Sequence, residues 1–94
     1  MALVHPGRVL KRELTARRLS ANRFALALRV PSGRITDILN LKRAITPDTA
    51  LRFARYFGTS AEFWMNLQGR FDLAVAEKEF GRTIAAEVKR SASS

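Results

Sequence analysis

Apolar residues recur along this chain every three or four positions, which is the spacing of amphipathic helices, and no stretch alternates in the manner of a strand. A first helix is predicted over residues 6–18, because Pro6 suits a first helical position, where its missing N–H costs nothing. Ser20 suits the N-cap of a second helix, which ends before Pro31 because the residue preceding a proline avoids helical backbone angles. A third, short helix is predicted over about residues 32–39.

Two further helices have clear beginnings. Residues 46–48 (TPD) supply a capping hydroxyl, a proline at the first position and an acidic residue in the first turn, and Gly58 ends that helix. Ser60 caps a fifth helix, and Gly69 is expected to break or bend it. The residues expected on the inward faces of these two helices are Ala50, Leu51, Ala54, Phe57, Phe63, Trp64 and Leu67.

The predicted fold class is all-α. Residues 1–69 are expected to form a helix-turn-helix domain, because the three-residue connection between the second and third helices suits the corner of that motif. Residues 70–94 are expected to form a C-terminal helical extension, frayed at Ser91 to Ser94. This extension either folds onto the core or serves as an arm that binds a partner, and the sequence leaves both open.

The charge of the chain is positive and unevenly distributed. Its 94 residues are 47% hydrophobic and 27% charged, which is ordinary for a globular protein, but the net charge is +9. Residues 1–58 hold twelve Lys and Arg against three acidic residues, whereas residues 59–94 hold five of each kind. The whole excess lies in the first two thirds, which favours a basic binding module for a polyanion, followed by a neutral extension.

Composition excludes several classes of site. Without cysteine there is no disulfide, thiolate metal site or cysteine nucleophile, and the single His5 cannot form an imidazole cluster. His5 is expected to cap the first helix, because it lacks a catalytic partner. No metal site, cofactor or enzymatic activity is predicted. No apolar run approaches the roughly 20 residues of a membrane span and no signal peptide is evident, so a soluble cytoplasmic protein is expected.

The third predicted helix has the clearest functional interpretation. If Ile35, Ile38 and Leu39 pack inward, the opposite face turns toward solvent. Arginine can donate two parallel hydrogen bonds to guanine, and Ser, Thr and Asp can address other base edges, so this face is predicted to read DNA bases in the major groove. The residues on it are Ser32, Gly33, Arg34, Thr36 and Asp37.

Phosphate contacts are predicted beside this helix. Asn40, Lys42 and Arg43 follow it and are placed to grip phosphates. Ser20 begins the second helix, whose amide groups and dipole can face another phosphate. The alternative is an ordinary polar surface helix, in which Arg34 and its neighbour one turn later, Asp37, form an ion pair.

Four aromatic residues leave a choice between core and surface. Phe63 and Trp64 could stack on single-stranded nucleic acid, but their place on an apolar face favours core packing. Phe53 and Tyr56 lie off the face defined by Leu51, and they are either partly buried or part of a dimer interface. The dimer interface is favoured, because a helix-turn-helix monomer has little area with which to bind tightly.

A family resemblance is carried by the segments HPGRVLKREL and RAITPDTALRFARYFGTSAEFWMNLQ. Together with the helix-turn-helix segment between them, they make residues 5 to about 73 resemble the HigA-type antitoxins of the phage-repressor-like (Xre-like) class. The resemblance implies a five-helix DNA-binding core, a homodimer and a palindromic operator near the protein's own promoter. It also implies a cognate toxin, typically a small mRNA endonuclease, and it places the base-facing positions on the same residues of the third helix.

Three positions depart from the family pattern. Arg29 and Leu41 stand where glycine is usual, and a left-handed backbone at Arg29 would cost about 1 kcal/mol. Arg29 either adds a phosphate contact or marks a different turn. Gly33 removes a side chain from the base-facing side, which narrows direct readout.

The predicted function is a dimeric, sequence-specific repressor that regulates its own operon and neutralises a toxin. Two alternatives remain: a transcriptional regulator without a toxin partner, and a protein-interaction module whose basic face docks an acidic partner. A basic membrane-binding helix is disfavoured, because the charges are spread over several short helices.

Overall fold

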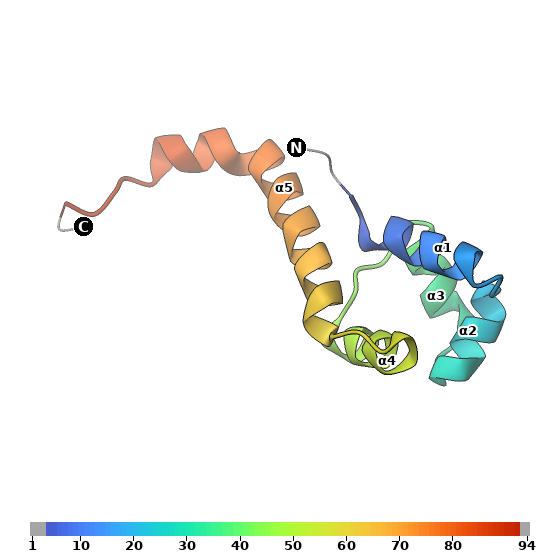
Figure 1. The fold of residues 1–94 in the computed structure, drawn as a ribbon. Coiled ribbons are helices and arrows are strands. Elements are labelled where there is room, and N and C mark those ends of the chain that lie inside the picture. The colour runs from blue at the N-terminus through green and yellow to red at the C-terminus, as the bar shows by residue number, and fades with distance from the viewer. Residues whose placement is uncertain (1–3, 93–94) are drawn as a thin grey trace.

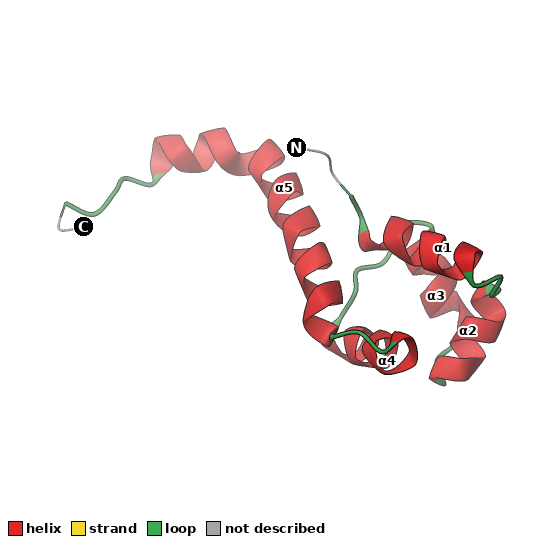
Figure 2. Cartoon of the chain, in the orientation of Figure 1, coloured by secondary structure: helices red, strands yellow, loops and turns green. Residues whose placement is uncertain are grey.

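The computed structural model of the chain describes residues 4–92, and within them five helices follow one another without a strand (Figures 1 and 2). The predicted all-α fold class is confirmed. The helices are α1 (Pro6–Ala16), α2 (Ala21–Leu28), α3 (Ser32–Leu39), α4 (Pro47–Phe57) and α5 (Ala61–Glu87).

Side chains that accept hydrogen bonds from backbone N–H groups mark four of the helix beginnings. The Nδ1 atom of His5 and the hydroxyls of Ser20, Thr46 and Ser60 each accept from a first-turn amide, at 2.9, 3.1, 3.4 and 3.1 Å respectively. Each such cap typically contributes about 1 kcal/mol. The predicted capping role of His5 is confirmed. α3 has no side-chain cap and begins directly after Pro31.

One hydrophobic core joins α1–α4 to the first part of α5. At its centre, the ring of Phe53 lies 5.3 Å from that of Phe24 and 5.0 Å from that of Trp64, which connects α4 to α2 and α5. The buried apolar residues are Leu10, Leu14, Phe24, Ala25, Leu28, Ile35, Ile38, Ile45, Ala50, Phe53 and Trp64.

Two apolar residues that were expected to face inward lie on the surface. Leu51 is 63% exposed and Phe63 is 44% exposed. α4 turns Phe53 toward the core together with Ala50, as expected for Ala50 only, so Leu51, one position on from Ala50, faces solvent. The inward assignment of these two residues is wrong.

The predicted dimer interface is wrong for one of its two residues. Phe53 has no exposed surface, and it contributes to the core of its own chain rather than to a contact with another. Tyr56 is 41% exposed, and its ring meets Phe24 edge-on with the centroids 5.2 Å apart.

The long helix α5 begins on the core and ends away from it (Figure 1). Its buried residues are Trp64 and Gln68, whereas Leu73 is 70% exposed. The break predicted at Gly69 does not occur, because the helix continues through that glycine to Glu87. Figure 1 shows a bend further along, where α5 leaves the core.

The boundary expected at residue 69 therefore falls inside a helix. Residues 88–92 follow the end of α5 without helical structure. Of the end predicted to fray, residues 93 and 94 lie outside the described part of the chain.

Gly7 marks a close approach between α1 and α3. A Cβ atom at Gly7 would overlap the backbone carbonyl oxygen of Ile38 and lie 3.0 Å from the Cδ2 atom of Leu41. Because glycine has no side chain, the beginning of α1 can rest directly against the end of α3.

Candidate nucleic-acid interface

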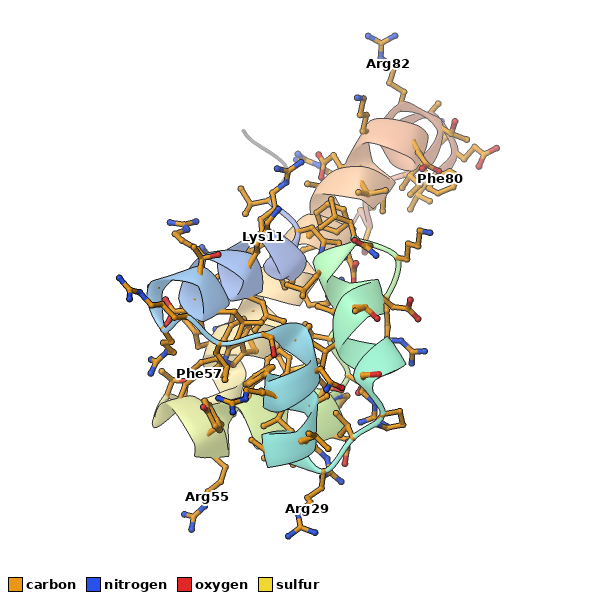
Figure 3. The ribbon with its side chains drawn as sticks, turned by 90° about the vertical axis from the view of Figure 1, so that its right-hand side faces the viewer. Lys11, Arg29, Arg55, Phe57, Phe80 and Arg82 are labelled. Carbon is orange, nitrogen blue, oxygen red and sulfur yellow. The ribbon has the colours of Figure 1, made fainter. Side chains whose placement is uncertain are left out.

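The corner between α2 and α3 contains a left-handed residue. Arg29, at the C-cap of α2, has φ 62° and ψ 44°. Its N–H donates to Leu26 O at 3.2 Å, and the N–H of Val30 donates to Ala25 O at 3.1 Å. The turn is left-handed despite the arginine, at a cost of about 1–2 kcal/mol. Figure 3 shows Arg29 pointing outward from this corner, and the residue is exposed.

α3 packs through its apolar side, which turns its polar side outward. Ile35 and Ile38 are fully buried, and Leu39 is partly buried against the core. None of the five residues predicted to read bases lies in the core: Ser32, Gly33 and Thr36 are exposed, and Arg34 and Asp37 are half-buried.

The guanidinium of Arg34 is held by a carboxylate on another helix. Its Nη1 donates to Oδ2 of Asp48, in the first turn of α4, at 2.9 Å. The same oxygen accepts from Nε of Arg52 at 3.0 Å, and Nη1 of Arg52 donates to the backbone oxygen of Leu28 at 2.8 Å. These three contacts, here called the Asp48 network, join the end of α2 to α3 and α4.

Asp48 is charged at neutral pH. Hydrogen bonds from Arg52 and Arg34 lower the pKa of Asp48 below its ordinary value, because both guanidinium groups stabilise the ionised carboxylate. The Asp48 network therefore keeps its acceptor across the physiological pH range.

Two other residues on the α3 face have partners within the chain. Asp37 Oδ2 accepts from Nη2 of Arg43 at 3.5 Å, so the alternative pair between Asp37 and Arg34 does not form. Thr36 Oγ1 donates to the backbone oxygens of Ser32 at 3.1 Å and Gly33 at 3.2 Å. These bonds use the hydroxyl proton of Thr36 and not its methyl group or its lone pairs.

The residues after α3 are exposed, and their loop is anchored to α5. Asn40, Lys42 and Arg43 all face solvent. Gln68, which is 4% exposed, accepts from the N–H of Ile45 at 2.8 Å. A buried amide thus fixes the far end of the loop that carries the predicted phosphate contacts. Leu41, the second non-glycine departure from the family pattern, has φ 63° at the exit from α3.

The N-terminus of α2 is also open to solvent. Ser20 is exposed, and its Oγ already accepts from the N–H of Arg23 as the helix cap. The cap uses the hydroxyl oxygen as an acceptor, which leaves the O–H of Ser20 as a donor.

Three residues that organise this surface were not predicted from the sequence: Asp48, Arg52 and Gln68. Arg52 lies four positions after Asp48, which is the spacing of a helical ion pair and was the available signal. Gln68 lies four positions after Trp64 on a buried face, where a polar residue indicates a buried hydrogen bond. The contact between Asp48 and Arg34 spans 14 residues and has no signal in the sequence.

The fold and this surface define a helix-turn-helix DNA-binding protein. A short helix backed by buried isoleucines, a tight corner before it and a basic N-terminal two thirds are the features of that class. The chain belongs to the HTH_3 helix-turn-helix family, which matches residues 10–64.

Named relatives include virulence and antitoxin proteins. The chain is 46% identical over 80 residues to Virulence-associated protein I of Dichelobacter nodosus, a match that covers 84% of this chain and 74% of that protein. An addiction module antidote protein of the HigA family from Coxiella burnetii is 47% identical, with a TM-score of 0.93, and the match covers 97% of this chain and 100% of that one.

A second solved structure contains DNA. The Pseudomonas aeruginosa antitoxin HigA, solved with the higBA promoter, is 40% identical, with a TM-score of 0.91 over 94% of this chain and 97% of that one. The resemblance to HigA-type antitoxins is confirmed, and the relatives and the fold are those of DNA-binding regulators and antitoxins rather than enzymes.

Two other features are absent from the described part of the chain. Residues 4–92 contain no group of three or more His, Cys, Asp and Glu that could hold a metal ion. None of the described helices is both long and apolar enough to cross a membrane.

Proposed function

We propose that this protein is an antitoxin that binds a palindromic operator as a dimer and represses its own operon. The observation that carries the proposal is the match to an antitoxin solved with its promoter, on a chain whose α3 turns a polar face to solvent. Bases are contacted by Ser32, Gly33, Arg34, Thr36 and Asp37, and phosphates by Ser20, Arg29, Asn40, Lys42 and Arg43.

The two groups of residues have different physical roles. Phosphate contacts release counterions, so they make binding to any duplex strong at low salt and weak at high salt. Contacts to base edges depend on sequence and add discrimination on top of that term. A chain with a net charge of +9 is suited to the first role, and the polar face of α3 is suited to the second.

The test is a salt titration by fluorescence anisotropy with two duplexes of equal length. One carries the promoter of the protein's own gene, and the other is the same sequence scrambled. We expect tighter binding to the promoter at every salt concentration, and parallel salt slopes for the two duplexes. Equal affinities would contradict the proposal, and failure to retain either duplex near physiological salt would favour the protein-interaction module.

Dimerisation is assigned to the exposed apolar side of α5. Leu73, Phe80 and Ile84 are 70%, 54% and 53% exposed, and their spacing of seven and four residues places them on one side of the helix. Figure 3 shows Phe80 on the part of α5 that projects beyond the core. A second copy would cover this side, and the two α3 helices would lie about 34 Å apart, one turn of B-DNA.

Introducing a positive charge on the apolar side of α5 tests this assignment. Phe80→Lys is expected to give a monomer by light scattering and to weaken promoter binding, because one half-site is lost. Leu51→Lys is the comparison on α4, where Leu51 is 63% exposed against 54% for Phe80. Leu51 lines the same surface hollow as Tyr56, the exposed residue of the sequence-predicted interface, so loss of the dimer in this variant instead would favour that surface. A Phe80→Lys variant that stays dimeric at the wild-type concentration would refute the α5 interface.

Toxin neutralisation is proposed from the family of the relatives. The expected partner is a small mRNA endonuclease encoded beside this gene, and both proteins would act in the cytoplasm. Expression of the neighbouring small reading frame alone should arrest growth, and co-expression of this chain should restore it. A harmless neighbour that does not co-purify with this chain would favour the alternative, a regulator without a toxin partner.

A further inference from the structure

We propose that Asp48 is a positioning residue that orients Arg34 for base reading and thereby sets the sequence discrimination of α3. The inference rests on the proposed function, because it requires that Arg34 contacts a base. Its basis is the Asp48 network, in which a carboxylate on α4 is bonded to the arginine of α3 across 14 residues.

The network is anchored where α2 ends. Arg52 is bonded through Nη1 to the backbone oxygen of Leu28, so its guanidinium has a fixed reference on α2. Through Nε, Arg52 then holds Oδ2 of Asp48, the same atom that accepts from Arg34. Asp48 is 58% exposed in its side chain, yet two cations restrain its orientation.

The contact leaves Arg34 able to bind a base. A guanidinium has five N–H donors, and Asp48 accepts from only one of the two terminal nitrogens. Reading guanine takes two parallel N–H bonds, which the remaining donors can supply. Because Arg34 is ordered before DNA arrives, less conformational entropy is lost when it binds. Its side chain is 29% exposed, so it lies at the surface without moving freely in solvent.

If the Asp48 carboxylate acted only through its charge, its removal would have a different effect from the one that positioning predicts. An acidic group near a DNA-binding surface repels phosphates, so its removal should tighten binding to every duplex. Positioning instead predicts that removal weakens discrimination between duplexes. The ratio of operator affinity to random-duplex affinity separates the two, since a uniform charge effect cancels in that ratio.

Two substitutions separate charge from orientation. Asp48→Asn and Asp48→Ala remove the same negative charge, but only asparagine keeps an oxygen that can accept from Arg34 and Arg52. We expect Asp48→Ala to lower the operator-to-random ratio about fivefold or more, a large part of what one bidentate arginine–guanine contact supplies. Asp48→Asn should retain most of the ratio. Both should bind random duplex as well as the wild type or slightly better.

Two controls show whether the effect passes through Arg34. In an Arg34→Ala background, the difference between Asp48→Ala and Asp48→Asn should disappear. Glu13→Ala removes another exposed negative charge, on α1, that is likewise paired with an arginine (Arg17), and it should leave the ratio unchanged. Circular dichroism and thermal unfolding of every variant establish that the helices are intact.

The possible outcomes are distinct. If Asp48→Ala discriminates as well as the wild type, or binds the operator more tightly than Asp48→Asn does, the carboxylate does not position Arg34 and the inference is overturned. If the wild type itself binds operator and scrambled duplex equally, the proposed function fails, and this inference fails with it. A loss of discrimination in Asp48→Ala that persists without Arg34 also overturns it.

Discussion

Replacing Gly7 with alanine is expected to destabilise the fold, because the new methyl group would meet backbone rather than a flexible side chain. The Cβ would overlap the carbonyl oxygen of Ile38, which also accepts from the N–H of Leu41 at 3.0 Å and is therefore held in place. Normal carbon–oxygen contacts of this kind are about 3.3–3.6 Å, so α1 and α3 would have to separate by well over an ångström.

The magnitude follows from two opposing effects. Overpacking of this kind typically costs about 1–3 kcal/mol. Alanine is favoured over glycine within a helix by about 0.5–1 kcal/mol, which offsets part of that cost. The free energy of unfolding should fall by about 1–2 kcal/mol. For a domain of this size, each kcal/mol lowers the Tm by about 4–8 °C, so the shift is easily measured.

The assay is urea and thermal unfolding followed by circular dichroism, with Gly69→Ala as the matched control. Gly69 lies within α5 and has nothing within 4 Å of the position its Cβ would take. That substitution should raise stability by about 0.5–1 kcal/mol. If Gly7→Ala is as stable as the wild type while Gly69→Ala gains the expected amount, the close contact between α1 and α3 is not real.

Three further predictions concern DNA binding, the corner between α2 and α3, and the cap at the beginning of α1. Arg34→Ala should cost about 1–3 kcal/mol on the operator and relax its sequence preference, whereas Lys42→Ala should weaken binding to all duplexes similarly and reduce the salt slope by about 1. Equal losses of Arg34→Ala on operator and scrambled DNA would count against a reading role. Arg29→Gly should raise the free energy of unfolding by about 0.5–1 kcal/mol, because relief of the left-handed backbone exceeds the entropy that glycine adds to the unfolded chain. The same substitution should lower DNA affinity, because a phosphate contact is lost. Chemical denaturation measures the first effect and fluorescence anisotropy the second. Burial lowers the pKa of His5, so as the pH falls the unfolded chain takes up a proton before the folded chain does, and stability should decline below about pH 6.5. His5→Asn keeps a capping side chain and should remove that part of the decline in unfolding experiments from pH 7.5 to 5.5.

The helix boundaries could be predicted because their signals are local. Ser20, Thr46 and Ser60 each cap the helix that they were expected to begin, since a capping bond reaches only two or three residues along the chain. The break predicted at Gly69 was wrong because an isolated glycine weakens a helix by only about 1 kcal/mol. The packing of Trp64 and Gln68, the buried residues of α5 that precede Gly69, easily exceeds that cost.

The buried side of α4 could not be predicted with the same certainty. Ala50, Leu51, Ala54 and Phe57 all fit a helical period, and so do Ala50 and Phe53. Periodicity fixes which residues share a side to within about one position, and the choice then depends on which neighbours a helix meets. In the structure α2 and α5 meet the side of Phe53, so Leu51 is left outside.

The sequence by itself determined that the chain folds into successive short helices and that α3 turns Arg34 and its polar neighbours away from the core. Both follow from caps and apolar spacing, which act within a few residues. Only the tertiary structure decided that Phe53 is buried and that Arg34 is bonded to Asp48, because each depends on how separate helices pack against α4. Contacts between residues far apart in the chain are set by that packing, and no local pattern encodes them.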